Sequence, residues 1–122
     1  MIREAYVSFE VAKLLNEKGF VQETLMVYNQ NGNFMPNGAI EDTYQVFYSA
    51  PTHQMAMAWL REVHNLHIDI DPSEGNWSPT VITLNDWTCV IRFGDTIPIQ
   101  DTYEEAVEAA LKYTLENVIY HN

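Results

Sequence analysis

Apolar positions recur at helical intervals in three separate stretches of the chain. Residues 9–18 place apolar side chains on one face, and Ser8 stands where an N-cap is expected. Residues 102–118 repeat the pattern after Thr102, which is followed three residues later by an acid, as in a capping box. The sequence therefore predicts helices over both stretches.

The third helical stretch follows Pro51, a residue type favoured at the first position of a helix. A helix that begins there and ends near Asn65 carries a stripe of apolar side chains, which we expect to be buried. The stripe consists of Met55, Ala56, Trp59, Leu60, Val63 and Leu66. Trp59 is accordingly expected in the core.

Between the helices, the pattern changes to two groups of strands, because β-branched and aromatic residues are enriched and polarity alternates. The first group comprises residues 24–28, a weaker strand around Phe34, and residues 43–48; the second comprises residues 66–71, 80–84 and 87–93. Asn31-Gly32 and Asn85-Asp86 favour tight hairpin turns within these groups.

The predicted order is α-β-β-(β)-α-β-β-β-α, which indicates an α+β fold. Short links between neighbouring strands favour antiparallel pairing. We therefore expect residues 1–122 to form a single domain, with an antiparallel sheet of five to six strands and three helices covering one face.

Charge narrows the choice of partner. Seventeen acids against six bases give a net charge of −11, and residues 63–122 hold ten acids and two bases. Binding to phosphate backbones depends on Lys and Arg, so nucleic acid is not an expected ligand. The favoured interpretation of the strong acidity is solubility; the alternatives are a surface that binds a basic protein or one that imitates nucleic acid.

Composition also bears on the compartment. The hydrophobic fraction is 47%, and the single cysteine, Cys89, is expected to be a small buried apolar residue. Residues 1–10 interrupt each apolar stretch with a charge or a hydroxyl, so no signal peptide or membrane span is predicted. We expect a cytoplasmic protein that does not bind membranes.

The densest polar cluster is the segment from His64 to Asp71. His67, Asp69 and Asp71 project from one face of the predicted strand, and His64 lies just before it. Imidazole and carboxylate groups are suitable ligands for a divalent metal, but the spacing matches neither a zinc-protease helix nor an EF-hand loop. These four residues are weak metal candidates, and a solvated strand face is favoured.

No motif identifies a catalytic residue. The chain contains no Gly-x-Ser-x-Gly elbow, Walker loop or Gly-x-Gly-x-x-Gly fingerprint. Paired acids such as Glu104 and Glu105 have a sufficient explanation at a helix N-terminus. We therefore predict no cofactor and favour a non-enzymatic role.

Two tryptophans are candidates for binding a partner. Trp77 lies in a predicted loop, where it either folds back as a lid on the core or stays exposed as an anchor; the lid is favoured. Trp87 begins a predicted strand, and with Trp77 it marks the strand region as a candidate contact surface.

Segments from the three predicted helical stretches also carry a family resemblance. The segments are residues 6–15 (YVSFEVAKLL), 18–20 (KGF), 50–62 (APTHQMAMAWLRE) and 103–113 (YEEAVEAALKY). They resemble a family of small uncharacterised proteins from gut anaerobic bacteria, often found near phage-derived or mobile elements. The resemblance implies a phage-type or mobile-element accessory protein and supplies no activity or site.

Three hypotheses follow. The first is an acidic, non-enzymatic interaction module that binds another protein or forms a homo-oligomer, with contacts around Trp77 and Trp87. The second is a small enzyme or a ligand- or metal-binding domain that uses the segment from His64 to Asp71. The third is a nucleic-acid mimic that binds a host DNA-binding protein.

Overall fold

Helices and strands alternate along the chain in the order that the hydrophobic pattern predicts. The computed structural model describes residues 3–39, 45–87, 89–91 and 97–119. Its helices are α1 (Phe9–Glu17), α2 (His53–His64) and α3 (Tyr103–Tyr113), and its strands are β1 (Met26–Asn29), β2 (Phe34–Pro36), β3 (Phe47–Ser49), β4 (Leu66–Ser73), β5 (Asn76–Thr83) and β6 (Cys89–Ile91). The predicted strand residues 43–44, 88 and 92–93 lie outside the described residues.

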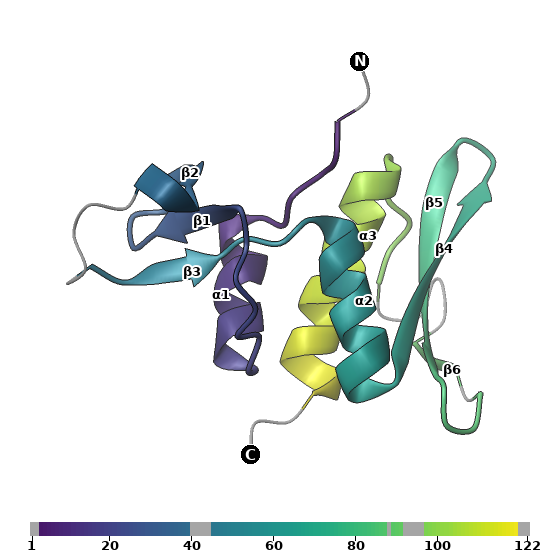
Figure 1. The fold of residues 1–122 in the computed structure, drawn as a ribbon. Helices are drawn as coiled ribbons and strands as arrows, with labels where there is room; N and C mark the ends of the chain where they lie inside the picture. Colours follow the sequence, from purple (N-terminus) through teal and green to yellow (C-terminus); the bar gives the residue numbers. More distant parts are fainter. Residues whose placement is uncertain (1–2, 40–44, 88, 92–96, 120–122) are drawn as a thin grey trace.

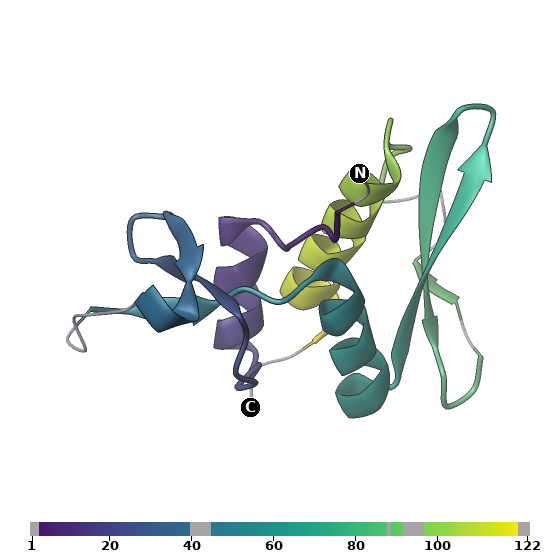
Figure 2. The ribbon, with the colours of Figure 1, turned by 45° about the horizontal axis from the view of Figure 1, so that its top comes forward.

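The strands form two sheets, whereas the sequence analysis expected one sheet of five to six strands. The described strands pair antiparallel in the orders β2-β1-β3 and β4-β5-β6. Figures 1 and 2 show the first sheet beside α1 and the second on the far side of α2 and α3. Pairing between neighbouring strands follows from sequence, but α2 separates the two groups, and each group covers its own side of the helices.

The core lies among the helices and the inner face of the second sheet. Its fully buried side chains include Val11, Leu15, Phe20, Leu60, Val81, Val107, Leu111 and Leu115. They come from the three α-helices, the loop after α1, β5, and the segment that follows α3. The α+β class with three helices is thus confirmed. α2 and α3 cover one face of the β4-β5-β6 sheet, whereas α1 lies beside the first sheet, so the expectation that all three helices cover one face of a single sheet is not met.

The ends of α1 lie where the sequence analysis places them. Ser8 Oγ accepts a hydrogen bond from the N–H of Val11 at 3.2 Å, as an N-cap does. Gly19 follows the helix with φ of 100°, and the N–H of Phe20 donates to the carbonyl of Leu15 at 2.9 Å. This is a Schellman ending, in which a left-handed residue closes the last turn.

The predicted cap and stripe of α3 are confirmed as well. Thr102 Oγ1 accepts from the N–H of Glu105 at 3.1 Å. Val107, Ala110 and Leu111 are buried on one side of the helix. After Tyr113 the chain continues for five residues as π-helix, Thr114–Val118. In the described part of the chain, no helix is long and apolar enough to cross a membrane.

The start of α2 corrects the sequence analysis. Thr52, and not Pro51, marks the boundary, because Thr52 Oγ1 accepts from the N–H of Met55 at 3.2 Å and the helix begins at His53. Pro51 lies buried before the cap, where its carbonyl accepts from the N–H of Val7 at 3.1 Å. The threonine hydroxyl accepts a hydrogen bond from a free backbone N–H of the first turn, whereas a proline side chain has no acceptor atom.

The buried stripe of α2 is also narrower than predicted. Ala56, Trp59 and Leu60 are buried, but Met55 is 41% exposed and Val63 is 55% exposed. Spacing alone cannot distinguish a side chain at the centre of a helix face from one at its border. The two exposed residues lie at that border and leave apolar surface uncovered.

The second sheet begins with a long hairpin. β4 and β5 pair over eight residues each, from Leu66 opposite Thr83 to Ser73 opposite Asn76. The segment around Pro72, predicted as a loop, therefore continues the strand. Trp77 lies in β5, paired with Pro72, and not in a loop as predicted. Its backbone also exchanges two hydrogen bonds of 2.9 Å with Gln100, which hold the strand beside the approach to α3.

Candidate functional site

The polar face predicted for residues 66–71 is present on β4. Leu66 and Ile68 are buried, so the alternate residues His67, Asp69 and Asp71 project from the opposite face. A straight strand spaces such alternate residues by roughly 7 Å, which sets them in a row. Within the described ranges, no group of three or more His, Cys, Asp or Glu side chains is placed to hold a metal ion.

His64 does not join this row. It ends α2, and its ring meets the ring of Trp59 edge-on with centroids 4.7 Å apart. Its Nε2 is buried and has no hydrogen-bond partner in the described structure. Burial lowers the pKa of His64 from its ordinary value of 6.5. The imidazole therefore packs in an aromatic cluster that also includes Phe20, whose ring meets that of Trp59 edge-on with centroids 5.6 Å apart.

The two candidate tryptophans have different surroundings. Trp77 is half-buried, and its ring stands perpendicular to that of Tyr103 at the start of α3, with centroids 5.4 Å apart. Trp87 is 79% exposed and has φ of 62°, in the left-handed region that bulky residues rarely adopt. Its turn begins beside the end of α2, where the N–H of Leu84 donates to the carbonyl of Asn65 at 2.8 Å. Trp77 thus packs in part against Tyr103, whereas Trp87 is largely exposed, and a role of either residue in binding a partner stays a prediction.

Cys89 lies in β6, and its side chain is outside what the structure describes. The prediction that it is buried stays a prediction.

A polar cluster that sequence analysis missed connects all three helices; we call Ser8, His53 and Glu108 the Glu108 cluster. Glu108 accepts the N–H of Ser8 at 2.7 Å and the Ser8 hydroxyl at 3.0 Å. Its Oε1 also lies 3.0 Å from His53 Nε2. Ser8 and Glu108 are 100 residues apart, so no local motif signals the contact.

The arrangement of the Glu108 cluster is structural. In a nucleophilic triad the histidine lies between the hydroxyl and the carboxylate, whereas here the carboxylate lies between the other two. The Ser8 hydroxyl is already used as the N-cap of α1. Nearby, burial and the Glu108 charge raise the pKa of Tyr28, whose hydroxyl donates to the carbonyl of Val7 at 2.7 Å. The cluster thus fixes the N-terminal ends of α1 and α2 against α3.

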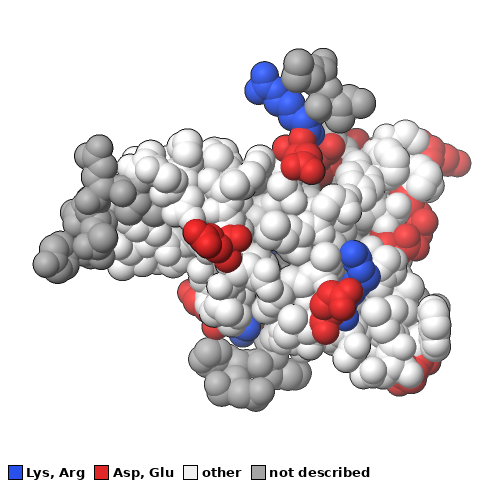
Figure 3. All heavy atoms as spheres, in the orientation of Figure 1, with Lys and Arg blue, Asp and Glu red and all other residues white. Residues whose placement is uncertain are grey.

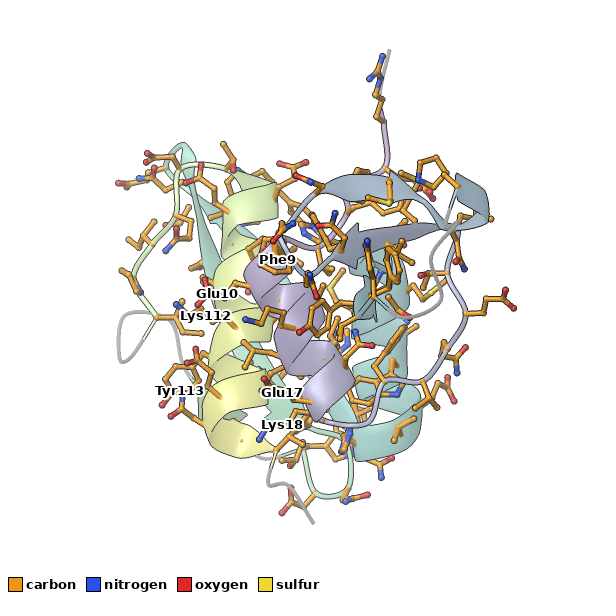
Figure 4. All side chains as sticks on the ribbon, turned by 90° about the vertical axis from the view of Figure 1, so that its left-hand side faces the viewer. Phe9, Glu10, Glu17, Lys18, Lys112 and Tyr113 are labelled. Carbon is orange, nitrogen blue, oxygen red and sulfur yellow. The ribbon has the colours of Figure 1, made fainter. Side chains whose placement is uncertain are left out.

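A hollow of about 440 Å³ opens beside the Glu108 cluster, and acidic side chains are among the residues that line it. The acidic lining residues are Glu10, Glu104, Glu105 and Glu108. Lys112 crosses the hollow, and its Nζ lies 2.9 Å from Glu10 on α1 (Figure 4). That hydrogen bond and the Glu10 charge raise the pKa of Lys112. Glu105 accepts a hydrogen bond from the capping residue Thr102. Three of the four carboxylates, those of Glu10, Glu105 and Glu108, therefore have partners within the chain.

The uncovered side of α2 forms the second surface of interest. Two hollows, of about 560 Å³ and 200 Å³, share Met55 as a wall. Leu25, which is 83% exposed, lines the first, and Val63 lines the second. We call the apolar residues of both hollows the α2 surface: Phe20, Leu25, Met55, Ala58, Trp59 and Val63. In Figure 3, which has the orientation of Figure 1, uncharged atoms cover most of the visible face and acidic groups are scattered among them.

The sequence carries a signal for the α2 surface in the form of regularly spaced apolar residues, but that spacing predicts a buried helix face. Met55 and Val63 have the spacing of a buried stripe, and only the packing of α2 shows that they lie outside it. Leu25 belonged to a predicted strand, although β1 begins one residue later, at Met26.

The chain matches no protein-family model, and no curated protein or solved structure is significantly similar to it. The family resemblance of residues 6–20, 50–62 and 103–113 therefore stays a prediction.

Proposed function

We propose that this chain is a non-enzymatic protein-interaction module whose partner binds the α2 surface. The observation that carries the proposal is the exposure of three large apolar side chains around two adjoining hollows: Leu25 at 83%, Met55 at 41% and Val63 at 55%. Contiguous apolar surface with concave relief is typical of a protein-binding site.

The packing beneath this surface supports the proposal. Trp59 lines one hollow and makes edge-on contacts with the rings of Phe20 and His64, so a buried aromatic cluster lies beneath the surface. A preorganised surface loses little conformational freedom when a partner binds. Trp87 follows the turn that is tied to the end of α2, and it is a further exposed aromatic side chain.

The other two hypotheses are less well supported by the geometry. The four candidate ligands from His64 to Asp71 do not converge, because His64 turns to Trp59 and the rest follow one strand face. A nucleic-acid mimic needs its carboxylates in regular rows, and on the face shown in Figure 3 the acidic groups are separated by uncharged surface.

A matched pair of variants tests the proposal. Val63→Asp places a charge on the α2 surface, and Val46→Asp makes the same change at a valine of similar exposure, 52%, next to β3. We expect Val63→Asp to reduce capture of a specific protein from a lysate of the natural host by about tenfold or more. Val46→Asp should leave capture unchanged.

Circular dichroism and thermal unfolding must show both variants folded. Equal capture by the two variants would contradict the proposed surface, and so would the absence of any captured protein combined with a monomeric mass in sedimentation velocity.

A further inference from the structure

The apolar positions of the α2 surface have a defined spacing. Met55 and Val63 are eight residues apart on one helix, which corresponds to about 12 Å along its axis. Met55 is the shared wall of the two hollows, and Val63 closes the second. A partner that fills the second hollow therefore needs apolar side chains distributed over a similar length, and one that also enters the first hollow must extend past Met55.

Each hollow also has a negative charge at its border. Glu23 lines the first hollow and Glu62 the second, and both are exposed. Among the described residues that line the hollows there is no Lys or Arg; Arg61, the nearest base in sequence, lines neither. The whole chain has a net charge of −11. Lysine or arginine next to the partner's apolar residues would complement this pattern.

The same charges disfavour a second copy of the chain as occupant. A symmetric contact would place the same surface on both sides, so Glu23 and Glu62 would face identical carboxylates. Each copy would also bring a net charge of −11.

Backbone hydrogen bonding favours a helix over an extended segment. α2 satisfies its own backbone groups from His53 to His64, so it offers no strand edge to a partner. An extended segment buried on it would leave N–H and C=O groups unpaired, whereas a helix satisfies them internally. Apolar residues at positions i, i+4 and i+8 of a helix span the length of the second hollow, and a further turn of the same helix reaches past Met55 toward the first.

We propose that the α2 surface binds an amphipathic helix of a second protein, with apolar residues on one face and lysine or arginine on both borders of that face. This inference rests on the proposed function and specifies the partner's chemistry. The apolar residues fill the hollows on either side of Met55, and the basic residues lie opposite Glu23 and Glu62.

The test uses two labelled synthetic 18-residue helices of leucine, alanine and one charged residue type. Both carry leucine at i, i+4 and i+8; the charged borders are lysine in one and glutamate in the other. Fluorescence anisotropy should show that the lysine helix binds the full chain at least about tenfold more tightly than the glutamate helix, with affinity falling as NaCl rises. Val63→Asp should weaken this binding by about tenfold, and Val46→Asp should affect it little.

A charge-matched pair separates specific binding from general attraction to an acidic protein. Glu23→Gln/Glu62→Gln removes two charges at the hollows, and Glu17→Gln/Glu74→Gln removes two exposed charges elsewhere. We expect a loss of affinity several-fold larger for the first pair. Equal losses would overturn the inference, because attraction would then depend only on net charge.

Two outcomes distinguish this inference from the proposed function. If Val63→Asp abolishes capture of a natural partner but the lysine helix shows no preference for the α2 surface, the interaction module stands and the basic helix is wrong. If the chain forms a dimer that Val63→Asp dissociates, the occupant is a second copy and the inference is overturned.

Discussion

His64 shows how a titratable residue can be used for packing. Its ring stacks edge-on with Trp59, and its Nε2 is buried with no partner in the described structure. Because burial lowers the pKa of His64 in the folded state, the unfolded chain binds the proton more tightly. The contribution of His64 to stability is therefore present above the ordinary pKa of 6.5 and decreases as the pH falls below it.

We expect His64→Phe to reduce the loss of stability on acidification, because phenylalanine keeps the ring and cannot be protonated. Urea unfolding at pH 7.5 and pH 5.5 measures the difference for each protein, and the wild type should lose more free energy of unfolding than the variant. At pH 7.5 the variant should be at least as stable as the wild type, since a buried unpaired nitrogen is removed. An identical pH dependence in both proteins would show that His64 does not contribute.

At the scale of elements, the features that could be predicted from the sequence are those set by residues close together in the chain, such as helix caps and the alternation within a strand. Ser8 and Thr102 cap their helices because a hydroxyl and a backbone N–H three residues away meet in any helix start. The alternation of Leu66 and Ile68 with polar residues likewise reflects one strand packed on one core.

Features that arise from packing between elements, such as which helix face is covered and which remote residues meet, could not be predicted in this way. Met55 and Val63 look like core residues until the position of α2 is known. Glu108 looks like one more surface acid on α3, because its partners Ser8 and His53 are remote in sequence. The division into two sheets also arises from tertiary packing, since each strand group has the same local signals in either arrangement.

The turn between β1 and β2 gives a test at this scale. Gly32 has φ of 85°, and a β-carbon added there would lie 3.0 Å from the Phe9 ring on α1. Gly32→Ala should lower the free energy of unfolding by about 1–3 kcal/mol, because it combines backbone strain with a close contact.

Gly38→Ala is the matched control. Gly38 has no positive φ and open space around it, so alanine should change stability by less than about 1 kcal/mol. Chemical denaturation of both variants compares them directly. A loss at Gly38 equal to that at Gly32 would contradict the assigned cause.

At the scale of the whole molecule, the Glu108 cluster joins the beginning of the described chain to its last helix. One carboxylate accepts two hydrogen bonds from Ser8 and contacts His53, so α1, α2 and α3 share a single acceptor group. An amide at this position could not accept all three in the same way.

We expect Glu108→Gln to lower the free energy of unfolding by about 1–3 kcal/mol. Glu104→Gln, which removes the same charge from an exposed position of α3, should cost less than about 1 kcal/mol. In a double-mutant cycle, Ser8→Ala and Glu108→Gln should be non-additive, because they remove the same interaction. Additive losses would show that the two residues stabilise the fold independently.

The separation of 100 residues between Ser8 and Glu108 also has a kinetic consequence. The hairpin of β4 and β5 closes a short loop, whereas the contact between α1 and α3 requires nearly the whole chain to be ordered first. We therefore expect the bond between Ser8 and Glu108 to form late, after the rate-limiting barrier of folding. Its removal should then accelerate unfolding and leave the rate of refolding almost unchanged, which would make this carboxylate a determinant of the lifetime of the native state.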